Sequence, residues 1–530
     1  MGDSRSAQDP CTDAGPWRAL ALETLAKRML AVLVAVGVLV IAASAVSFGI
    51  TARPFIGGVD FYYYILTARD LASGVAVPND RYSYLPGVFS FWRTVFTVSD
   101  GSLFSLQWAY LAVLFANAFL VGGILTTLTR SWPAGGIAAA LYLFVAGRIE
   151  GFAGITEPIA TIPFLLGLWL WILMRGDQGS YAGLLALAAG FGLALFTKQQ
   201  GGLLALGVVG LLPALWSPDP SKRYQISHLA ILPLGAGAVF LVAMVVEGGG
   251  LAAVWTALRT VRDYQAQGFW VQHVNRVFEL TQPVSNFFLS SCIAWAVLTF
   301  FHNRAPVVSS SFLLTLGITI FATLGCLIQF TKRGYLHYAM LLLPAALIAA
   351  GLGLYAVIKL LDWAARAWRW PTVPLVMLGT AVFLWTNSAG ATALVRDTSA
   401  MATASARWLT HEDIGRIFTP LCSRIGPGTA LLLIPPRENQ IHWFCRTRPV
   451  DSTIRNPWEP TEPQNYRPVL SSPAVQNVFV LSPDYGAYEK RYFETGDWRR
   501  FPQELGERGF RETFRFRVGT LYQKNASGGP

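Results

Sequence analysis

Long apolar runs alternate with short polar breaks over the first 393 residues of the chain. An apolar helix of about 20 residues crosses a bilayer, and shorter runs are compatible with broken or re-entrant helices. The pattern therefore predicts a mainly α protein, a polytopic transmembrane bundle of about eleven helices. The predicted spans are residues 29–50, 104–128, 132–147, 154–174, 180–197, 202–216, 225–246, 284–302, 307–330, 335–358 and 372–393.

The first span, 29–50, lacks a small-x-small cleavage site, so we expect it to be a retained helix and not a signal peptide. Residues 1–28 then form a cytoplasmic N-terminal segment, 29–393 the transmembrane domain, and 394–530 a separate soluble domain. Only two connections are long, 51–103 and 247–283.

Basic residues in the short connections predict the orientation, because cytoplasmic loops carry an excess of Lys and Arg. With the N-terminus inside, the inner loops hold twice as many basic residues as the outer ones. An odd number of helices then places the C-terminal domain on the extracytoplasmic side of the cell membrane. The inner set is Arg130, Arg175, Lys222, Arg223, Arg304, Lys359, Arg366 and Arg369, and the outer set is Arg148, Lys198, Lys332 and Arg333.

The composition agrees with a lipid environment: 53% of residues are hydrophobic and 13% are charged, against about a quarter charged in soluble proteins. The net charge of +11 is explained by basic inner loops, so we expect no nucleic-acid partner. The lipid bilayer is the expected environment of the first 393 residues.

Both long outer connections are rich in aromatic residues. The stretch 61–72, which includes Tyr62, has the spacing of a helix lying flat on the outer leaflet. The stretch from Trp255 to Trp270 predicts a second interfacial helix.

The C-terminal domain reads as a small α/β unit. Apolar runs at 430–434, 478–481 and 514–522 predict strands, with helical stretches at 404–418 and 488–508. The chain contains no glycine-rich phosphate loop, G-x-S-x-G or H-E-x-x-H.

Cys422 and Cys445 both fall in this domain, where an oxidising compartment would let them form a disulfide, although two free thiols are the alternative. Such a bond would stabilise the domain by about 3 kcal/mol. No C-x-x-C pair indicates a metal site, so no metal or other cofactor is assigned.

Seven ionisable residues lie where predicted helices enter the bilayer from the outer side. Charged groups at that depth are costly and default to a functional hypothesis, with interfacial snorkelling as the alternative. They are Asp60, Glu150, Glu157, Lys198, Lys332, Arg333 and His337.

Asp60 precedes the aromatic helix, where a carboxylate either caps the helix or accepts the proton of a hydroxyl nucleophile. Lys198 and Gln199 lie in a polar break with two glycines, which suits an anionic phosphate or a plain tight turn. Lys332 and Arg333 run against the positive-inside tendency, which suggests an anion, and His337 is a weaker candidate beside them.

These residues resemble the GT-C class of membrane glycosyltransferases in their order along the chain and in their common side of the membrane. The branch they resemble is that of protein mannosyltransferases and aminoarabinose lipid A transferases. The likeness covers about residues 29–360. It is carried by Asp60 with 61–64, by 82–88 with Tyr82, by 198–201 and by 333–338.

The resemblance implies an inverting transfer of a sugar from a polyprenyl-phosphate donor to a glycan, lipid or protein acceptor at the outer face. Asp60 would be the catalytic base, and Lys198 with Lys332 or Arg333 would hold the donor phosphate. Many members of the family pair two acidic residues in or near the first loop or close it with His-Pro-Pro, whereas here Asp60 stands alone in the motif and the loop has Leu85-Pro86-Gly87. Glu150 or Glu157 would supply the acidic partner, and metal dependence stays open.

Two other classes compete with this interpretation. A lipid-linked glycan ligase or polymerase of the O-antigen type uses outer-loop arginines and would not need Asp60. A transporter or flippase would predict inverted repeats or ionisable residues at the midplane of the membrane, and the sequence shows neither repeats nor acids in the middle of the predicted helices.

Overall fold

The computed structural model describes most of the bundle and of the C-terminal domain. The described residues are 59–74, 85–149, 154–175, 180–216, 224–247, 255, 271–281, 284–301, 307–331, 336–367, 411–435, 439–450, 463–485, 490, 493–494 and 498–524. The predicted spans 29–50 and 372–393 and the boundary at 393 lie outside them.

Nine predicted spans fall on described residues, and each coincides with a helix or a pair of consecutive helices. In chain order these are α4 (Leu103–Thr129), α5 (Trp132–Arg148), α6 (Glu157–Arg175), α7 (Tyr181–Thr197), the 3-10 helix η3 (Gln199–Trp216), α8 (Ile226–Val246), α11 (Val284–Phe301), α12 (Ser310–Leu327) with η5 (Ile328–Thr331), and η6 (Leu336–Tyr338) with α13 (Ala339–Ala367). Five described helices are long and apolar enough to cross a membrane, or six if α10 (Val271–Leu280) and α11 form one bent span.

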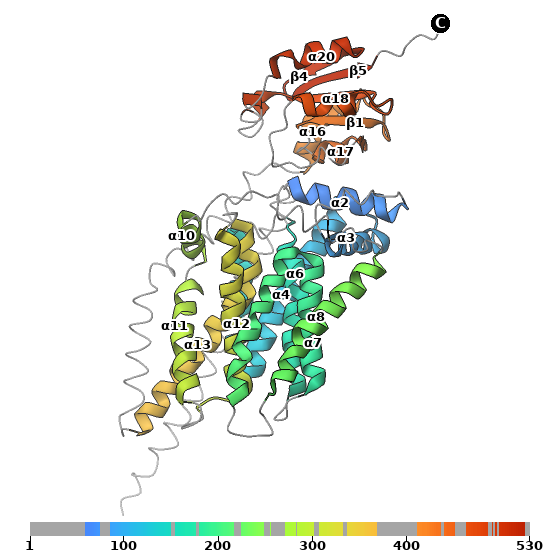
Figure 1. Cartoon of the computed structure of the whole chain (residues 1–530). Helices are drawn as coiled ribbons and strands as arrows, with labels where there is room; N and C mark the ends of the chain where they lie inside the picture. Colours follow the sequence, from blue (N-terminus) through green and yellow to red (C-terminus); the bar gives the residue numbers. More distant parts are fainter. Residues whose placement is uncertain are drawn as a thin grey trace, which may run out of the picture.

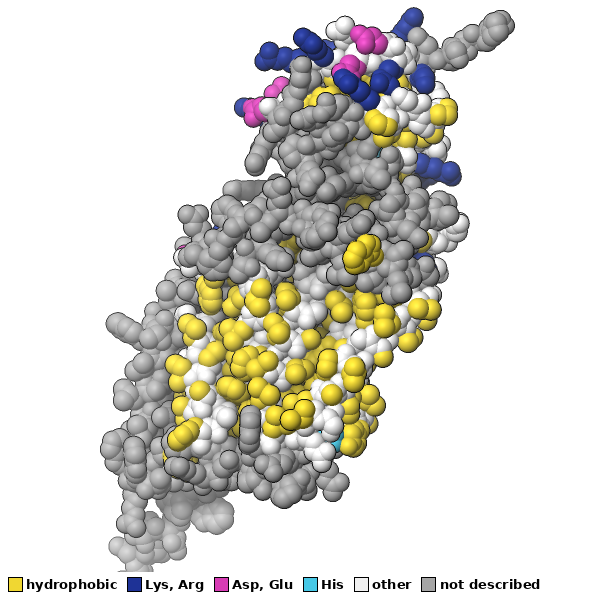
Figure 2. Space-filling view, viewed as in Figure 1, with side chains coloured by type: hydrophobic (Ala, Val, Ile, Leu, Met, Phe, Trp, Pro, Cys, Tyr) yellow, Lys and Arg dark blue, Asp and Glu magenta, His cyan; other side chains and the backbone are white. Residues whose placement is uncertain are grey.

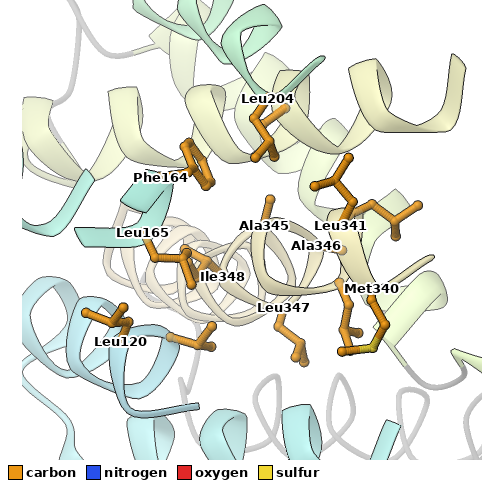
Figure 3. Close-up of a cluster of buried hydrophobic side chains, with 14 of the residues drawn as sticks. Leu120, Phe164, Leu165, Leu204, Met340, Leu341, Ala345, Ala346, Leu347 and Ile348 are labelled. Carbon is orange, nitrogen blue, oxygen red and sulfur yellow. The ribbon is translucent and has the colours of Figure 1, made fainter. Parts of the chain in front are cut away.

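These helices form one bundle below the C-terminal domain (Figure 1). In its core α13 packs against α11, α12, α4 and α6, and Figure 3 shows buried side chains of α4, α6, η3 and α13 there. On the face shown in Figure 2, the described surface of the bundle is mostly apolar, whereas the basic and acidic side chains that can be seen gather on the C-terminal domain. Helix α8 is only 11% buried over its most apolar window, as expected of a helix that faces lipid. The chain is thus a polytopic membrane protein.

The first outer connection folds into two helices, α2 (Val59–Ala72) and α3 (Gly87–Val98). Helix α2 lies across the end of the bundle beneath the C-terminal domain (Figure 1). The expectation of a helix flat on the outer leaflet is wrong in one respect, because Phe61, Tyr62 and Tyr64 are fully buried by protein and not by lipid. Helix α3 was not predicted. Of the second connection, α10 is described, and most of the stretch 255–270 lies outside the described residues.

The C-terminal domain is an α/β unit with a five-stranded sheet in the order β2-β1-β3-β5-β4. The strands are β1 (Ala430–Ile434), β2 (Arg448–Pro449), β3 (Asn477–Leu481), β4 (Phe510–Phe516) and β5 (Gly519–Lys524). Strands β2, β1 and β3 are parallel, and β5 is antiparallel to β3 and β4. The run 514–522 is therefore not one strand: its chain reverses between β4 and β5.

Helices cover the sheet, and apolar side chains of both faces are buried in two separate clusters. The helices are α16 (His411–Cys422), α17 (Asn439–Phe444), α18 (Arg467–Leu470) and α20 (Phe501–Glu507). A disulfide joins Cys422, at the end of α16, to Cys445, just after α17. These two helices are thereby fixed as a corner on the side of the domain that faces α2 (Figure 1).

Candidate functional site

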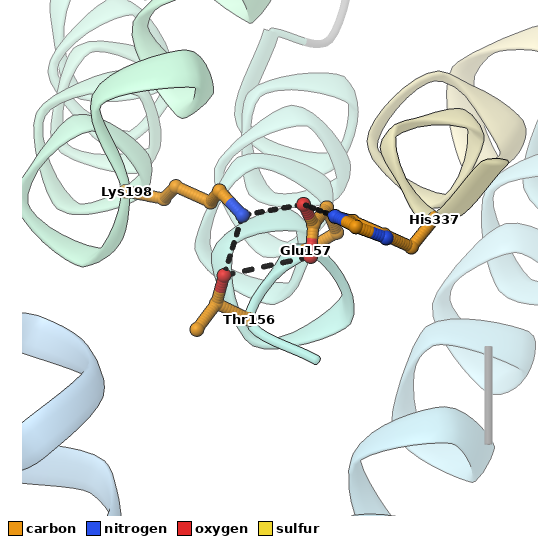
Figure 4. A network of polar contacts seen from close by, with 4 residues as sticks. All are labelled: Thr156, Glu157, Lys198 and His337. Carbon is orange, nitrogen blue, oxygen red and sulfur yellow. Dashed lines mark hydrogen bonds and ion pairs between the residues drawn. The ribbon is translucent and has the colours of Figure 1, made fainter. Parts of the chain in front are cut away.

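Three of the ionisable residues singled out in the sequence meet at the end of the bundle nearest α2. The Lys198 ammonium forms an ion pair with the Glu157 carboxylate, and Nε2 of His337 lies 4.0 Å from Oε1 of Glu157. Figure 4 shows Lys198 and His337 approaching Glu157 from opposite sides. Lys198 lies between α7 and η3, Glu157 begins α6, and His337 lies in η6. Only the tertiary structure brings the three together.

Thr156, which the sequence did not single out, completes this network. The Lys198 ammonium donates a hydrogen bond to Oγ1 of Thr156 at 2.7 Å, and that hydroxyl donates to Oε2 of Glu157 at 3.4 Å. On the other side, the Lys198 ammonium lies 5.3 Å from the centre of the Tyr338 ring, within cation–π range. A signal was present in the sequence, since Thr156 directly precedes an acidic first turn.

Helix ends explain why opposite charges occupy these two positions. Glu157 is the first residue of α6, and Lys198 directly follows the last residue of α7. A carboxylate is stabilised at a helix N-terminus and a cation at a C-terminus by the helix dipole. Because consecutive helices run antiparallel, the start of α6 and the end of α7 lie at the same end of the bundle.

The break after α7 is shaped by backbone contacts. Lys198 is extended and its N–H donates to the Ala194 carbonyl, while the N–H of Gly201 donates to the Lys198 carbonyl at 2.8 Å. A Cβ at Gly201 would lie 2.2 Å from the Ala194 oxygen, so only glycine fits this turn. The tight turn and the anion site, posed as alternatives from the sequence, are compatible.

The network is buried. Glu157 is 0% and Lys198 5% exposed, while the His337 side chain is 15% exposed. A buried ion pair costs desolvation free energy, and removing one partner would leave an uncompensated charge. Its persistence at this depth is typical of a functional group and not of surface snorkelling.

Asp60 lies in the first turn of α2, half-buried, and the neighbouring chain links it to the network. Gly154, two residues before Thr156, packs against Phe61 so closely that a Cβ there would lie 2.5 Å from Cδ2 of that ring. The Phe61 ring in turn meets Trp92 of α3 edge-on at 5.3 Å. The start of α2 is therefore in direct contact with the segment that leads into α6.

The other predicted site residues are distributed as follows. Tyr62 is buried in α2, and Gln199 begins η3 directly after Lys198. Tyr82, Glu150, Lys332 and Arg333 lie outside the described residues. Among the described residues no group of three or more His, Cys, Asp and Glu side chains is arranged to hold a metal ion.

Buried polar contacts fix the first turn of α6 from behind. The side chain of Asn117, on α4, is fully buried and donates to the Pro158 carbonyl at 2.7 Å. The Thr161 hydroxyl lies 2.9 Å from Oδ1 of Asn117. The Thr161 hydroxyl also lies 3.0 Å from the Pro158 oxygen, so Asn117 and Thr161 both contact the carbonyl next to Glu157.

A second set of contacts joins the C-terminal domain to α2. The ring of Phe444 lies 6.2 Å from that of Tyr62, and the Arg69 guanidinium lies 5.7 Å from the centre of the Trp443 ring. Burial lowers the pKa of Arg69, with Asp70 acting in the opposite direction. A partly desolvated cation interacts more strongly with a ring.

No protein-family model and no curated protein matches the sequence. Solved structures do match. ArnT from Cupriavidus metallidurans bound to undecaprenyl phosphate aligns with 93% of this chain and 99% of its own, at 16% identity and a TM-score of 0.51. Its apo form aligns with 96% of this chain and 100% of its own, at 16% identity and a TM-score of 0.55.

An oligosaccharyltransferase from Archaeoglobus fulgidus, in complex with Zn and sulfate, aligns with 92% of this chain and 73% of its own, at 12% identity and a TM-score of 0.47. The agreement with ArnT extends over nearly the whole of both chains, bundle and C-terminal domain included. The fold expected from the sequence is thereby confirmed: the chain has the fold of the GT-C class of membrane glycosyltransferases.

Proposed function

We propose that this chain is a membrane glycosyltransferase that transfers a sugar from a polyprenyl-phosphate donor to a glycan, lipid or protein acceptor. The observation that carries the proposal is the buried Lys198–Glu157–His337 network at the end of the bundle nearest α2, in a fold shared with an ArnT that binds undecaprenyl phosphate. The reaction takes place at the outer face, where α2 and the C-terminal domain lie, with the N-terminus in the cytoplasm.

The chemistry is a single displacement with inversion. The acceptor hydroxyl oxygen forms a bond to the anomeric carbon, the bond from that carbon to the phosphate oxygen breaks, and Asp60 accepts the hydroxyl proton. The phosphate leaves with the electron pair of the broken bond and remains attached to the polyprenyl chain.

Lys198 supports the leaving phosphate, because a cation already oriented toward the developing charge lowers the barrier. Lys332 and Arg333 adjoin His337 in the sequence and are proposed to contribute further positive charge. Asp60 is well situated to work beside this group, since Phe61 contacts the chain that leads into Thr156 and Glu157.

The proposal is tested by sugar transfer from a panel of radiolabelled polyprenyl-phosphate sugars, using membranes with matched amounts of wild type, Asp60→Asn and Asp70→Asn. Removing a general base costs about 10²- to 10⁴-fold in rate. Asp70 lies in the same helix beside Arg69, and Asp70→Asn controls for loss of a carboxylate from α2.

Transfer by the wild type that is lost in Asp60→Asn and kept in Asp70→Asn supports the proposal. Full activity of Asp60→Asn with a lipid-linked oligosaccharide would favour a ligase or polymerase of the O-antigen type. Absence of transfer from every donor would overturn the glycosyltransferase assignment and would favour the transporter or flippase alternative.

A further inference from the structure

The cation that faces the proposed phosphate site is already engaged by the protein. Of the three N–H donors of the Lys198 ammonium, one is directed to Glu157 and one to Thr156. The Glu157 carboxylate is fully buried and holds a full negative charge directly behind Lys198 when ionised. A phosphate that approaches Lys198 therefore meets a cation whose charge is largely compensated.

This arrangement is the opposite of what maximal phosphate affinity requires. Tight phosphate sites direct uncompensated Arg, Lys or backbone N–H groups toward the anion. Here a carboxylate is placed on the cation by the first turn of α6, which Asn117 of α4 holds through the Pro158 carbonyl and the Thr161 hydroxyl. The compensation is thus built into the packing of the bundle.

The charges of donor and product differ in a way that such a carboxylate can discriminate. The sugar donor is a phosphodiester with one negative charge, whereas the polyprenyl phosphate that leaves is a monoester carrying about 1.5 to 2 negative charges near pH 7. A nearby carboxylate repels the product more strongly than the donor. At a separation of about 6 Å and an effective dielectric constant of about 20, one extra unit of charge weakens binding by about a hundredfold.

We infer that Glu157 sets the phosphate affinity of the Lys198 site, keeping the monoester product weakly bound so that it leaves after transfer. The inference rests on the proposed function. Glu157 acts on Lys198 and on the electrostatic field of the site, so it is a positioning residue and not one that bonds to the sugar.

Glutamine at this position separates the charge from the geometry. Its side-chain oxygen accepts the hydrogen bond from Lys198 as the carboxylate does, but it carries no charge. If Glu157 only held Lys198 in place, Glu157→Gln would leave product affinity unchanged or lower it. If Glu157 sets the affinity, the same change tightens product binding.

The experiment uses the full chain in lipid nanodiscs and measures binding of undecaprenyl phosphate, of its methyl phosphodiester and of neutral undecaprenol. In the wild type we expect the monoester to bind no more than about threefold tighter than the diester, because Glu157 offsets its extra charge. In Glu157→Gln we expect the monoester to bind at least about tenfold tighter than in the wild type and the diester to change less. In transfer assays, product inhibition should strengthen and kcat should fall together with KM.

The outcomes distinguish the two proposals. If the wild type binds neither phosphate better than undecaprenol, the proposed function fails and the inference with it. If the wild type binds both phosphates but prefers the monoester by more than about tenfold, or if folded Glu157→Gln binds it no tighter, only the inference is overturned. The wild-type comparison decides the matter even if Glu157→Gln does not fold.

Lys198→Met serves as the reference for loss of the cation. It should weaken binding of both phosphates and leave undecaprenol unchanged, because the neutral lipid makes no charge interaction. Opposite effects of Lys198→Met and Glu157→Gln on the same ligand would not arise from general damage to the fold.

Discussion

The ring of Phe444, in the C-terminal domain, lies 6.2 Å from the ring of Tyr62, two residues after Asp60 in α2. On its other side Phe444 stacks with Phe418 of α16 at 6.4 Å. Phe444 therefore connects the core of the C-terminal domain to the helix that carries the proposed catalytic base. The contact gives the C-terminal domain a physical means of holding α2 in place.

Removing the Phe444 ring should loosen α2. Phe444→Ala deletes contacts to both Tyr62 and Phe418, and for this half-buried side chain we expect a loss of about 1 to 3 kcal/mol in stability. Amide hydrogen exchange across 59–72 should become faster. Arg515→Ala, in the exposed hairpin of the same domain, is the control and should leave exchange in α2 unchanged. Unaltered exchange in folded Phe444→Ala would show that α2 is held by other contacts.

The disulfide should stabilise the corner that presents Phe444. Cys422 and Cys445 close a loop with a sequence separation of 23, which the chain-entropy model values at about 3 kcal/mol. Cys422→Ser, Cys445→Ser and the double variant should lose similar stability, because each removes the same bond. Protease resistance of the C-terminal domain in denaturant measures this. A double variant much less stable than both single variants would indicate that the thiols act separately.

Gly154 tests the contact between the start of α2 and the segment that leads into α6. Its φ is +70°, and an added Cβ would lie 2.5 Å from Cδ2 of Phe61. Gly154→Ala should displace Phe61 and lower sugar transfer by about tenfold or more, since small misplacements near a reacting centre are costly. Gly74 has a φ of +71° but nothing within 4 Å, so Gly74→Ala reproduces the backbone strain without the clash.

Transfer assays at matched expression compare these two glycine variants. Retained activity in Gly74→Ala with loss in Gly154→Ala attributes the effect to Phe61. Equal losses in both would assign it to the backbone conformation alone.

Asn117 is expected to position Glu157 indirectly, through its hydrogen bond to the Pro158 carbonyl. Asn117→Ala removes the Asn117 donor from the Pro158 carbonyl and the Asn117 acceptor from the Thr161 hydroxyl, which then keep only their contact with each other, at a cost of about 1 to 3 kcal/mol in stability. Because Pro158 follows Glu157 directly, sugar transfer should fall as well. Thr94→Val, which removes an exposed hydroxyl bonded to its own helix, should have no effect on either measurement. Thermal unfolding and sugar transfer are measured on the same preparation of each variant.

The sequence alone predicted the nine described spans and the α/β character of the C-terminal domain. Those predictions succeed because lipid imposes a minimum length of apolar chain on each crossing, and because short apolar runs between turns favour strands. It also identified Lys198, Glu157 and His337 individually, since charges at the bilayer surface are costly enough to stand out.

The tertiary structure alone decided which of these charges meet. Thr156, Glu157, Lys198 and His337 come from three separate parts of the chain, and their pairing follows from how α6, α7 and α13 pack. Likewise, the aromatic spacing of α2 is the same whether lipid or protein covers it, and only the packing of α2 against α3, Gly154 and the C-terminal domain shows that protein does. The hydrophobic pattern of a segment indicates how much apolar surface it has. Which surface covers that segment depends on residues far away in the sequence.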